Sequence, residues 1–331
     1  MPLTDAPKAS ALRIALAMGV VYILWGSTYL AIAVAIETIP PLLMAGVRYL
    51  IAGSLLYGWA RWRGAGRPLR IHWRSAAVVG GLLLLGGNGG LVWGEQRVPT
   101  GAAALLVSTV PLWMVLLDWL RPGGSRPGWK VFAGLALGCT GLILLLRPTA
   151  GGHLDPVGAT VILLGAFCWA LGSLRSRTMP LPGSQLLATA MEMLSGGGLL
   201  VLVGLVTGES AHLHLAQVSS RSLLGLGYLI TGGALIGFTA YTWLLRAAPP
   251  ALVATYAYIN PIVAVFLGWL ILGEPLTGRT AAAAAVIIAG VVLITLSRRP
   301  QTQGQIERDH GRVIAGPDLE EAPQELRVRA S

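Results

Sequence analysis

The chain has 331 residues, of which 54% are hydrophobic and only 11% are charged. A soluble domain carries about 25% charged residues, so this composition excludes a soluble globular protein. The net charge of +10 does not indicate nucleic-acid binding, because the basic residues gather in short clusters between apolar runs, as membrane topology requires.

Apolar runs long enough to cross a bilayer recur along almost the whole chain. We expect helices, because backbone groups in hydrocarbon must bond internally and the runs are too long for barrel strands. The predicted fold is therefore an all-α membrane protein with ten transmembrane helices, at 12–36, 41–62, 75–93, 100–120, 129–146, 156–174, 185–206, 223–244, 252–272 and 280–296.

The predicted orientation follows from the Lys and Arg residues between and beside the spans, with the distal C-terminal tail left out. Fifteen fall on one side and only four (Arg97, Arg147, Arg221 and Arg279) on the other, so the first side faces the cytoplasm. This makes residues 1–11 a cytoplasmic tail, followed by a retained first span rather than a signal peptide. Residues 298–331, rich in charge, Gln, Gly and Pro, predict a second cytoplasmic and disordered tail.

The two halves of the membrane region, 12–146 and 156–297, match each other in sequence. The offset is 144 residues in the first two spans and 150 from the third onward. The clearest pairs are Trp25 with Trp169, Arg48 with Glu192, Trp93 with Trp243, Pro99 with Pro249, and Pro111 with Pro261. Because each half has five spans, an odd number, the halves are expected to be inverted repeats, which are typical of transporters that alternate access to a central site.

Several segments resemble the drug/metabolite transporter superfamily, specifically its EamA branch and the YedA-type inner-membrane exporters within it. They are LWGSTYLAI at 24–32, PPLLMAGVRYLIAG at 40–53, VPTGAAALLVSTVPL at 98–112, CWALGS at 168–173 and ATYAYINPIVAVFLGWLILGE at 254–274. The resemblance implies a ten-helix carrier in a bacterial-type inner membrane, with both termini cytoplasmic, that exports amino acids, related metabolites or drugs. The sequence departs from the family in one place. The family often ends the fourth span with Gly-Glu, but here the fourth span ends in LLDWLRPG, and the pair ends the ninth span as Gly273 and Glu274.

Two ionisable residues are expected deep in the membrane, where a charge costs about 3 kcal/mol on insertion scales. Arg48 and Glu192 each lie about 10 Å from opposite faces, at 1.5 Å of rise per residue. In one interpretation, Glu192 binds a proton or an ammonium group while Arg48 binds a carboxylate. In another, the two form a structural charge pair, or Arg48 reaches outward to anchor its helix.

Aromatic and polar residues of three spans are candidates for lining a cavity: Tyr22, Trp25 and Ser27 in the first, Asn88 in the third, and Tyr256, Tyr258 and Asn260 in the ninth. An aromatic face could stack on a hydrophobic solute or contact an amine, although ordinary packing would give the same pattern. Pro111 and Pro261 predict kinks, since proline cannot donate its backbone hydrogen bond.

The predicted function is secondary transport of small organic solutes by alternating access, most readily export. A nucleotide-sugar or organophosphate exchanger is an alternative, but it would need several basic residues in the cavity. A membrane-embedded enzyme is a weaker one, since every histidine lies in a loop or a tail. We predict no cofactor, no metal and no nucleic acid; the expected partners are the small-molecule substrate, the lipid bilayer and protons, in a monomer or homodimer.

Overall fold

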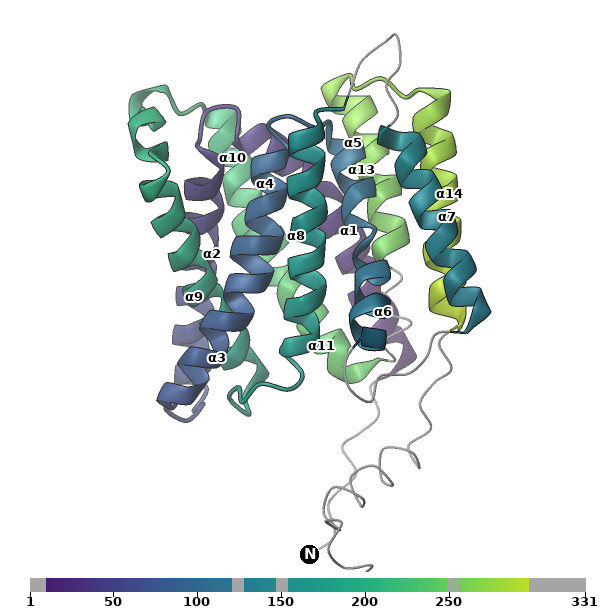
Figure 1. The fold of residues 1–331 in the computed structure, drawn as a ribbon. Coiled ribbons are helices and arrows are strands. Elements are labelled where there is room, and N and C mark those ends of the chain that lie inside the picture. The colour runs from purple at the N-terminus through teal and green to yellow at the C-terminus, as the bar shows by residue number, and fades with distance from the viewer. Residues whose placement is uncertain (1–9, 121–127, 147–153, 249–252, 254–255, 298–331) are drawn as a thin grey trace, which may run out of the picture. The chain divides into compact units, whose positions relative to one another are not determined.

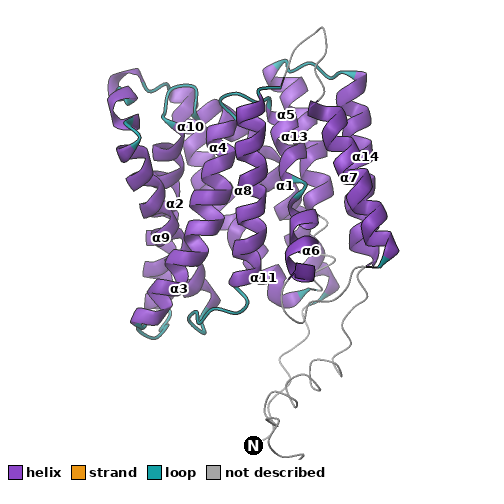
Figure 2. Cartoon of the chain, in the orientation of Figure 1, coloured by secondary structure: helices purple, strands orange, loops and turns teal. Residues whose placement is uncertain are grey.

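A computed structural model describes residues 10–120, 128–146, 154–248, 253 and 256–297 (Figure 1). Figure 2 shows that this part of the chain consists of helices joined by short connections, and it contains no strand. The predicted tails at 1–11, apart from its last two residues, and at 298–331 lie outside the described residues.

In the first half, the helices are α1 (Ala11–Ala35), α2 (Pro41–Trp62), α3 (Arg70–Gly80), the π-helix η1 (Gly81–Gly89), α4 (Gly90–Gly94), α5 (Thr100–Val107), α6 (Val110–Leu120) and α7 (Trp129–Leu146). In the second half they are α8 (Pro156–Arg175), α9 (Gln185–Val206), the short 3-10 helices η2 (Glu209–His212) and η3 (Leu215–Gln217), α10 (Ser220–Tyr228), the π-helix η4 (Leu229–Phe238), α11 (Thr239–Ala247), α13 (Tyr256–Leu272) and α14 (Gly278–Ser297).

Seven helical stretches of the described residues are long and apolar enough to cross a membrane. They are Ala11–Ala35, Pro41–Trp62, Arg70–Gly94, Thr100–Leu117, Pro156–Arg175, Gln185–Val206 and Ser220–Leu244. Two shorter apolar helical stretches follow, at Ile259–Leu272 and Gly278–Gly290. The all-helical membrane character is therefore confirmed.

The fourth predicted span differs from a single continuous helix. It is interrupted at Ser108 and Thr109, which separate α5 from α6. Pro111 has no N–H to bond the carbonyl of Val107, and the Ser108 and Thr109 hydroxyls donate to carbonyls one turn earlier, at 2.7 and 2.6 Å. The predicted kink at Pro111 is thus a break that begins three residues before the proline, whereas Pro261 lies inside the described length of α13.

The third and eighth spans share a feature that the apolar pattern does not predict, a π-helical middle. In η1 and at the start of α4, glycines allow α8 to approach closely: a Cβ at Gly87 would lie 2.9 Å from the Trp169 ring, and one at Gly90 would lie 3.1 Å from the Val161 carbonyl oxygen. Small residues at such positions let helix backbones meet, and the run Gly86-Gly87-Asn88-Gly89-Gly90 contains four of them.

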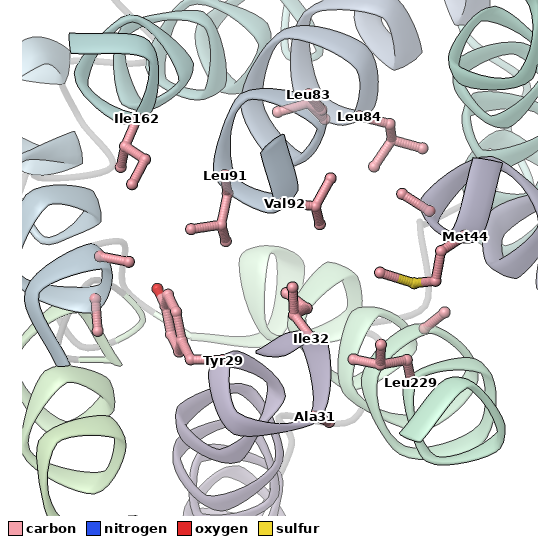
Figure 3. Close-up of a cluster of buried hydrophobic side chains, with 14 of the residues drawn as sticks. Tyr29, Ala31, Ile32, Met44, Leu83, Leu84, Leu91, Val92, Ile162 and Leu229 are labelled. Carbon is pink, nitrogen blue, oxygen red and sulfur yellow. The ribbon is translucent and has the colours of Figure 1, made fainter. Parts of the chain in front are cut away.

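Helices of the first half pack mainly on helices of the second. α2 lies along α9 and α7 along α14, while α1 packs on α13, and α5 and α6 pack on α8. The third span contacts α8 and α9, and the eighth contacts α1 and α2. Figure 3 shows Tyr29 and Ile32 pointing from α1 toward Leu91 and Val92 of α4 in the buried centre of this arrangement.

Two helix N-termini of the first half are capped by carboxylates of the second. Pro40 and Pro99, the residues before α2 and α5, provide no side-chain cap. Glu209 instead accepts hydrogen bonds from the backbone N–H groups of Leu42 and Leu43, at 3.2 and 2.9 Å. Glu274 accepts from those of Thr100 and Gly101, at 2.7 and 3.1 Å. Each carboxylate therefore satisfies two N–H groups that a helix leaves unpaired and complements the helix dipole.

Candidate functional site

A buried cavity lies where α1, α2, α8 and α13 meet the two π-helices. Its volume is about 90 Å³, measured as the space open to the centre of a water molecule. Its polar lining includes Arg48, Tyr49, Asn88 and Asn260, and its aromatic lining includes Trp25, Trp169, Phe238 and Tyr256. A largely apolar cavity with a few convergent polar groups is the usual form of a small-molecule site.

The polar wall is organised around Arg48 of α2, which is only 3% exposed. Its Nη2 donates to Tyr49 Oη and to Asn88 Oδ1, both at 2.6 Å, while its Nε has no partner among the described residues. No described carboxylate lies within 4 Å of the guanidinium to form an ion pair. Because a buried charge is costly without a counter-charge, this guanidinium is suited to binding a carboxylate from a solute.

The aromatic wall is organised around Trp25 of α1. The Trp25 indole N–H donates to the Gly233 carbonyl oxygen of η4 at 3.2 Å. Its ring lies edge-on to Trp169 and Tyr256, with centroids 6.1 and 5.4 Å apart. A Cβ at Gly237 would lie 2.7 Å from the Trp25 ring nitrogen, so the glycines of η4 give this ring its space. Such a wall offers flat apolar surface to a solute.

Asn260 of α13 adds a second polar group to the cavity. It is 3% exposed, and its Oδ1 has no hydrogen-bond partner among the described residues. A buried amide oxygen without a partner is costly to leave unpaired. It can therefore accept a hydrogen bond from a bound solute or from water.

Five of the predicted residues meet around this cavity: Arg48, Trp25, Asn88, Tyr256 and Asn260. Tyr22 does not line it and packs instead beside Met18, Val21 and Tyr241. Ser27 does not line it either, because its hydroxyl bonds the Ile23 carbonyl oxygen at 2.7 Å and Tyr228 Oη at 2.6 Å. The Tyr258 side chain lies outside the described part of the structure.

The predicted structural pair between Arg48 and Glu192 is not formed. Glu192 is 6% exposed and does not line the cavity. It belongs to the face of α9 that packs on α3, where a Cβ at Gly80 would lie 2.4 Å from the Glu192 carbonyl oxygen. Arg48 is bonded to Tyr49 and Asn88 instead.

The cavity also contains residues that the sequence did not single out. Phe238 could have been found from the repeat, since it matches Asn88 at the offset of 150 residues. Tyr49 gives no such signal, because a tyrosine beside an arginine in an apolar run is not distinctive. Glu95 does not line the cavity, but it is buried, whereas a charge seven residues after Asn88 would be expected at the interface.

The sequence is similar to a family of transporters along most of its length. The EamA-like transporter family matches residues 12–147 and 156–296. The inner membrane transporter YedA of Escherichia coli K12 is 40% identical over 285 residues, which cover 85% of this chain and 90% of YedA. A "Probable amino-acid metabolite efflux pump" of the same organism is 24% identical over 287 residues, 82% of this chain and 91% of that protein.

A crystal structure supports the fold. It matches with a TM-score of 0.61 at 22% identity and covers 87% of this chain and 98% of that one. The helical membrane fold, the buried cavity and the match along both halves lead to one conclusion: the chain belongs to the EamA-like transporter family.

Proposed function

We propose that this protein is a secondary transporter, most readily an exporter, for small organic solutes that carry a carboxylate and an apolar or aromatic group, such as amino acids and related metabolites. One observation carries the proposal. The buried Arg48 faces a cavity whose other wall is aromatic. The guanidinium would bind the carboxylate in a bidentate manner, while Trp25, Trp169 and Phe238 would contact the apolar group.

The proposed mechanism is alternating access by ten spans in two inverted five-helix repeats. The helix packing supports it, because exchanging the halves turns several of the main contacts into other observed contacts. The packing of α1 on α13 corresponds to that of α8 on α5, and the packing of the third span on α9 corresponds to that of the eighth span on α2. Repeat partners also line the same cavity: Trp25 with Trp169, Asn88 with Phe238, and Val110 with Asn260.

Location and orientation follow from the relatives and the charges. The chain would lie in a bacterial-type inner membrane, as YedA of Escherichia coli does, with both termini cytoplasmic according to the Lys and Arg distribution. Proton coupling through Glu192 stays a prediction, as does the choice between monomer and homodimer. The efflux-pump relative supports the amino-acid class of solute.

The alternative of a nucleotide-sugar or organophosphate exchanger receives less support. A phosphorylated solute carries two or more negative charges, which calls for several basic groups. Arg48 is the one basic residue in the described lining of the cavity. The same lining includes no histidine and no carboxylate for acid–base catalysis.

The test uses the purified chain in proteoliposomes and counterflow of radiolabelled phenylalanine, leucine and phenethylamine, the last of which lacks a carboxylate. We expect exchange of the two amino acids and little of the amine. Arg48→Gln should slow phenylalanine exchange about 10- to 100-fold, the equivalent of one charged hydrogen bond. Arg221→Gln is the control, since Arg221 forms an exposed ion pair with Glu37. Equal transport of phenethylamine, or normal exchange by Arg48→Gln, would overturn the proposal.

A further inference from the structure

Glu95 lies in the sequence between residues that line two different hollows of the protein. Glu95 directly follows α4. Leu91 of α4 and Asn88 of the preceding η1 line the central cavity. Trp93 and Gln96, its neighbours in sequence, line a second pocket of about 490 Å³ at the ends of α1, α2 and α9. In the proposed orientation this second pocket faces the periplasm, so we name it the outer pocket. Glu95 is itself in the described lining of neither hollow, but its sequence neighbours Leu91 and Gln96 line the cavity and the outer pocket.

The Glu95 carboxyl group is buried without a partner. The residue is 9% exposed, and neither carboxylate oxygen has a hydrogen-bond partner among the described residues. Other carboxylates at the same end of the molecule are paired: Glu209 and Glu274 cap helices, and Glu37 lies 3.6 Å from Arg221. An ionised carboxylate in such a place is costly unless something binds to it.

Charged and titratable groups face Glu95 from three directions. They are Tyr29 of α1, Arg48 of α2 and Glu274 of the connection between α13 and α14. Burial first, and then the negative charge of Glu274, raise the pKa of Glu95 well above its usual range, while the Arg48 guanidinium offsets this in part. The neutral carboxyl form is therefore favoured in this conformation.

We propose that Glu95 is the proton-binding site that couples solute export to the proton gradient, an inference that rests on the proposed function. A proton from water in the outer pocket binds one carboxylate oxygen of Glu95 and neutralises it. When the cavity opens to the cytoplasm, the O–H bond breaks, the proton leaves to water on that side, and the carboxylate is restored. The solute crosses in the opposite direction.

A proton fits this site better than a metal cation. Ca²⁺ takes six to eight oxygen ligands, and Mg²⁺ needs near-octahedral coordination. Here the free oxygens belong to Glu95 alone, because those of Glu274 accept hydrogen bonds from Thr100 and Gly101. Glu192 is the competing carboxylate, but in contrast to Glu95 none of the described residues of its helix, α9, lines either hollow.

The first experiment measures protonation directly and needs no substrate. Infrared difference spectra of the purified full chain between pH 5 and pH 9 should contain the band of a neutral, buried carboxyl group. Glu95→Gln should remove this band, while Glu37→Gln should retain it. In Glu274→Gln the band should disappear at a lower pH than in the unaltered protein, because the repelling charge is gone. A spectrum unchanged by Glu95→Gln, or a band removed only by Glu192→Gln, would overturn the inference.

The second experiment measures coupling in proteoliposomes with radiolabelled phenylalanine. In the unaltered protein, a pH gradient should raise flux several-fold over equal pH. In Glu95→Gln the ratio of the two fluxes should fall to one, while Glu37→Gln should keep it. A Glu95→Gln variant that still responds to the gradient would contradict the proton role. Loss of all flux would assign Glu95 to the ammonium group of the solute and contradict it too. If the unaltered protein does not carry phenylalanine, the proposed function fails, while the infrared band still tests Glu95.

Discussion

The two halves of the molecule contribute similar backbone and different side chains to the cavity. Both provide a tryptophan from their first span, Trp25 and Trp169, and both provide a π-helix from their third. The side chains then diverge: Asn88 of the first half corresponds to Phe238 of the second, and Arg48, which lines the cavity, corresponds to Glu192, which does not.

The difference separates two requirements. In the proposed mechanism, similar backbones in the two halves would allow two conformations of comparable energy that open to opposite sides. Different side chains make one wall polar and the other aromatic, so that an amphipathic solute has one preferred orientation. In this proposal, the features that the two halves share relate to the conformational change, and the side chains that differ between them relate to the binding of the solute.

The difference between the polar and the aromatic wall can be removed most directly by replacing Asn88 with phenylalanine, the residue at the matching position 238. Asn88→Phe should fill much of the cavity and remove an acceptor from Arg48, so that phenylalanine counterflow falls 100-fold or more. That loss corresponds to about 3 kcal/mol. Phe238→Leu, which keeps the opposite wall apolar, should change counterflow less than 10-fold. Normal counterflow by Asn88→Phe would show that the polar wall does not bind solute.

The contact between the halves can be tested by adding one methyl group. A Cβ at Gly80 of α3 would lie 2.4 Å from the Glu192 carbonyl oxygen of α9, so Gly80→Ala forces the two helices apart. Overpacking of this kind costs about 1–3 kcal/mol, and we expect a Tm lower by several degrees in detergent. Gly198→Ala on α9, where a Cβ meets no atom within 4 Å, should keep or raise the Tm.

The pH dependence of stability tests a difference between the halves at Glu95. Its partner at the repeat offset of 150 residues is Leu245, which has no titratable side chain. The raised pKa of Glu95 means that the folded protein binds this proton more tightly than the unfolded chain. Its contribution to stability is then present at acid pH and is lost as pH rises through the folded pKa, by about 1.4 kcal/mol per unit of pKa difference. Glu95→Gln should accordingly match the Tm of the unaltered protein at acid pH and exceed it by a few degrees at alkaline pH. A Tm difference that does not vary with pH would contradict this.

The sequence predicted the parts of the site that depend on the repeat and on burial of charge. The offset that matches Trp25 with Trp169 anticipates their edge-on contact, and the apolar surroundings of Arg48 and Asn88 mark both as unusual. The sequence could not predict that Tyr22 lies outside the cavity. The helical spacing shows which residues share a face of α1, but it does not show which neighbouring helix covers each turn of that face. The burial of Glu95 arises from α1, α2 and the connection after α13, so its local sequence does not reveal it. The π-helices depend on packing between glycines and Trp25 or Trp169 rather than on local propensity.

The caps from Glu209 and Glu274 connect helices of the two halves through backbone hydrogen bonds. Glu209 ties the segment after α9 to the start of α2, and Glu274 ties the end of α13 to the start of α5. Each tie joins a helix of one half to a helix of the other. If the proposed alternating access keeps these bonds, each body that moves as a unit would contain helices of both halves rather than one repeat alone.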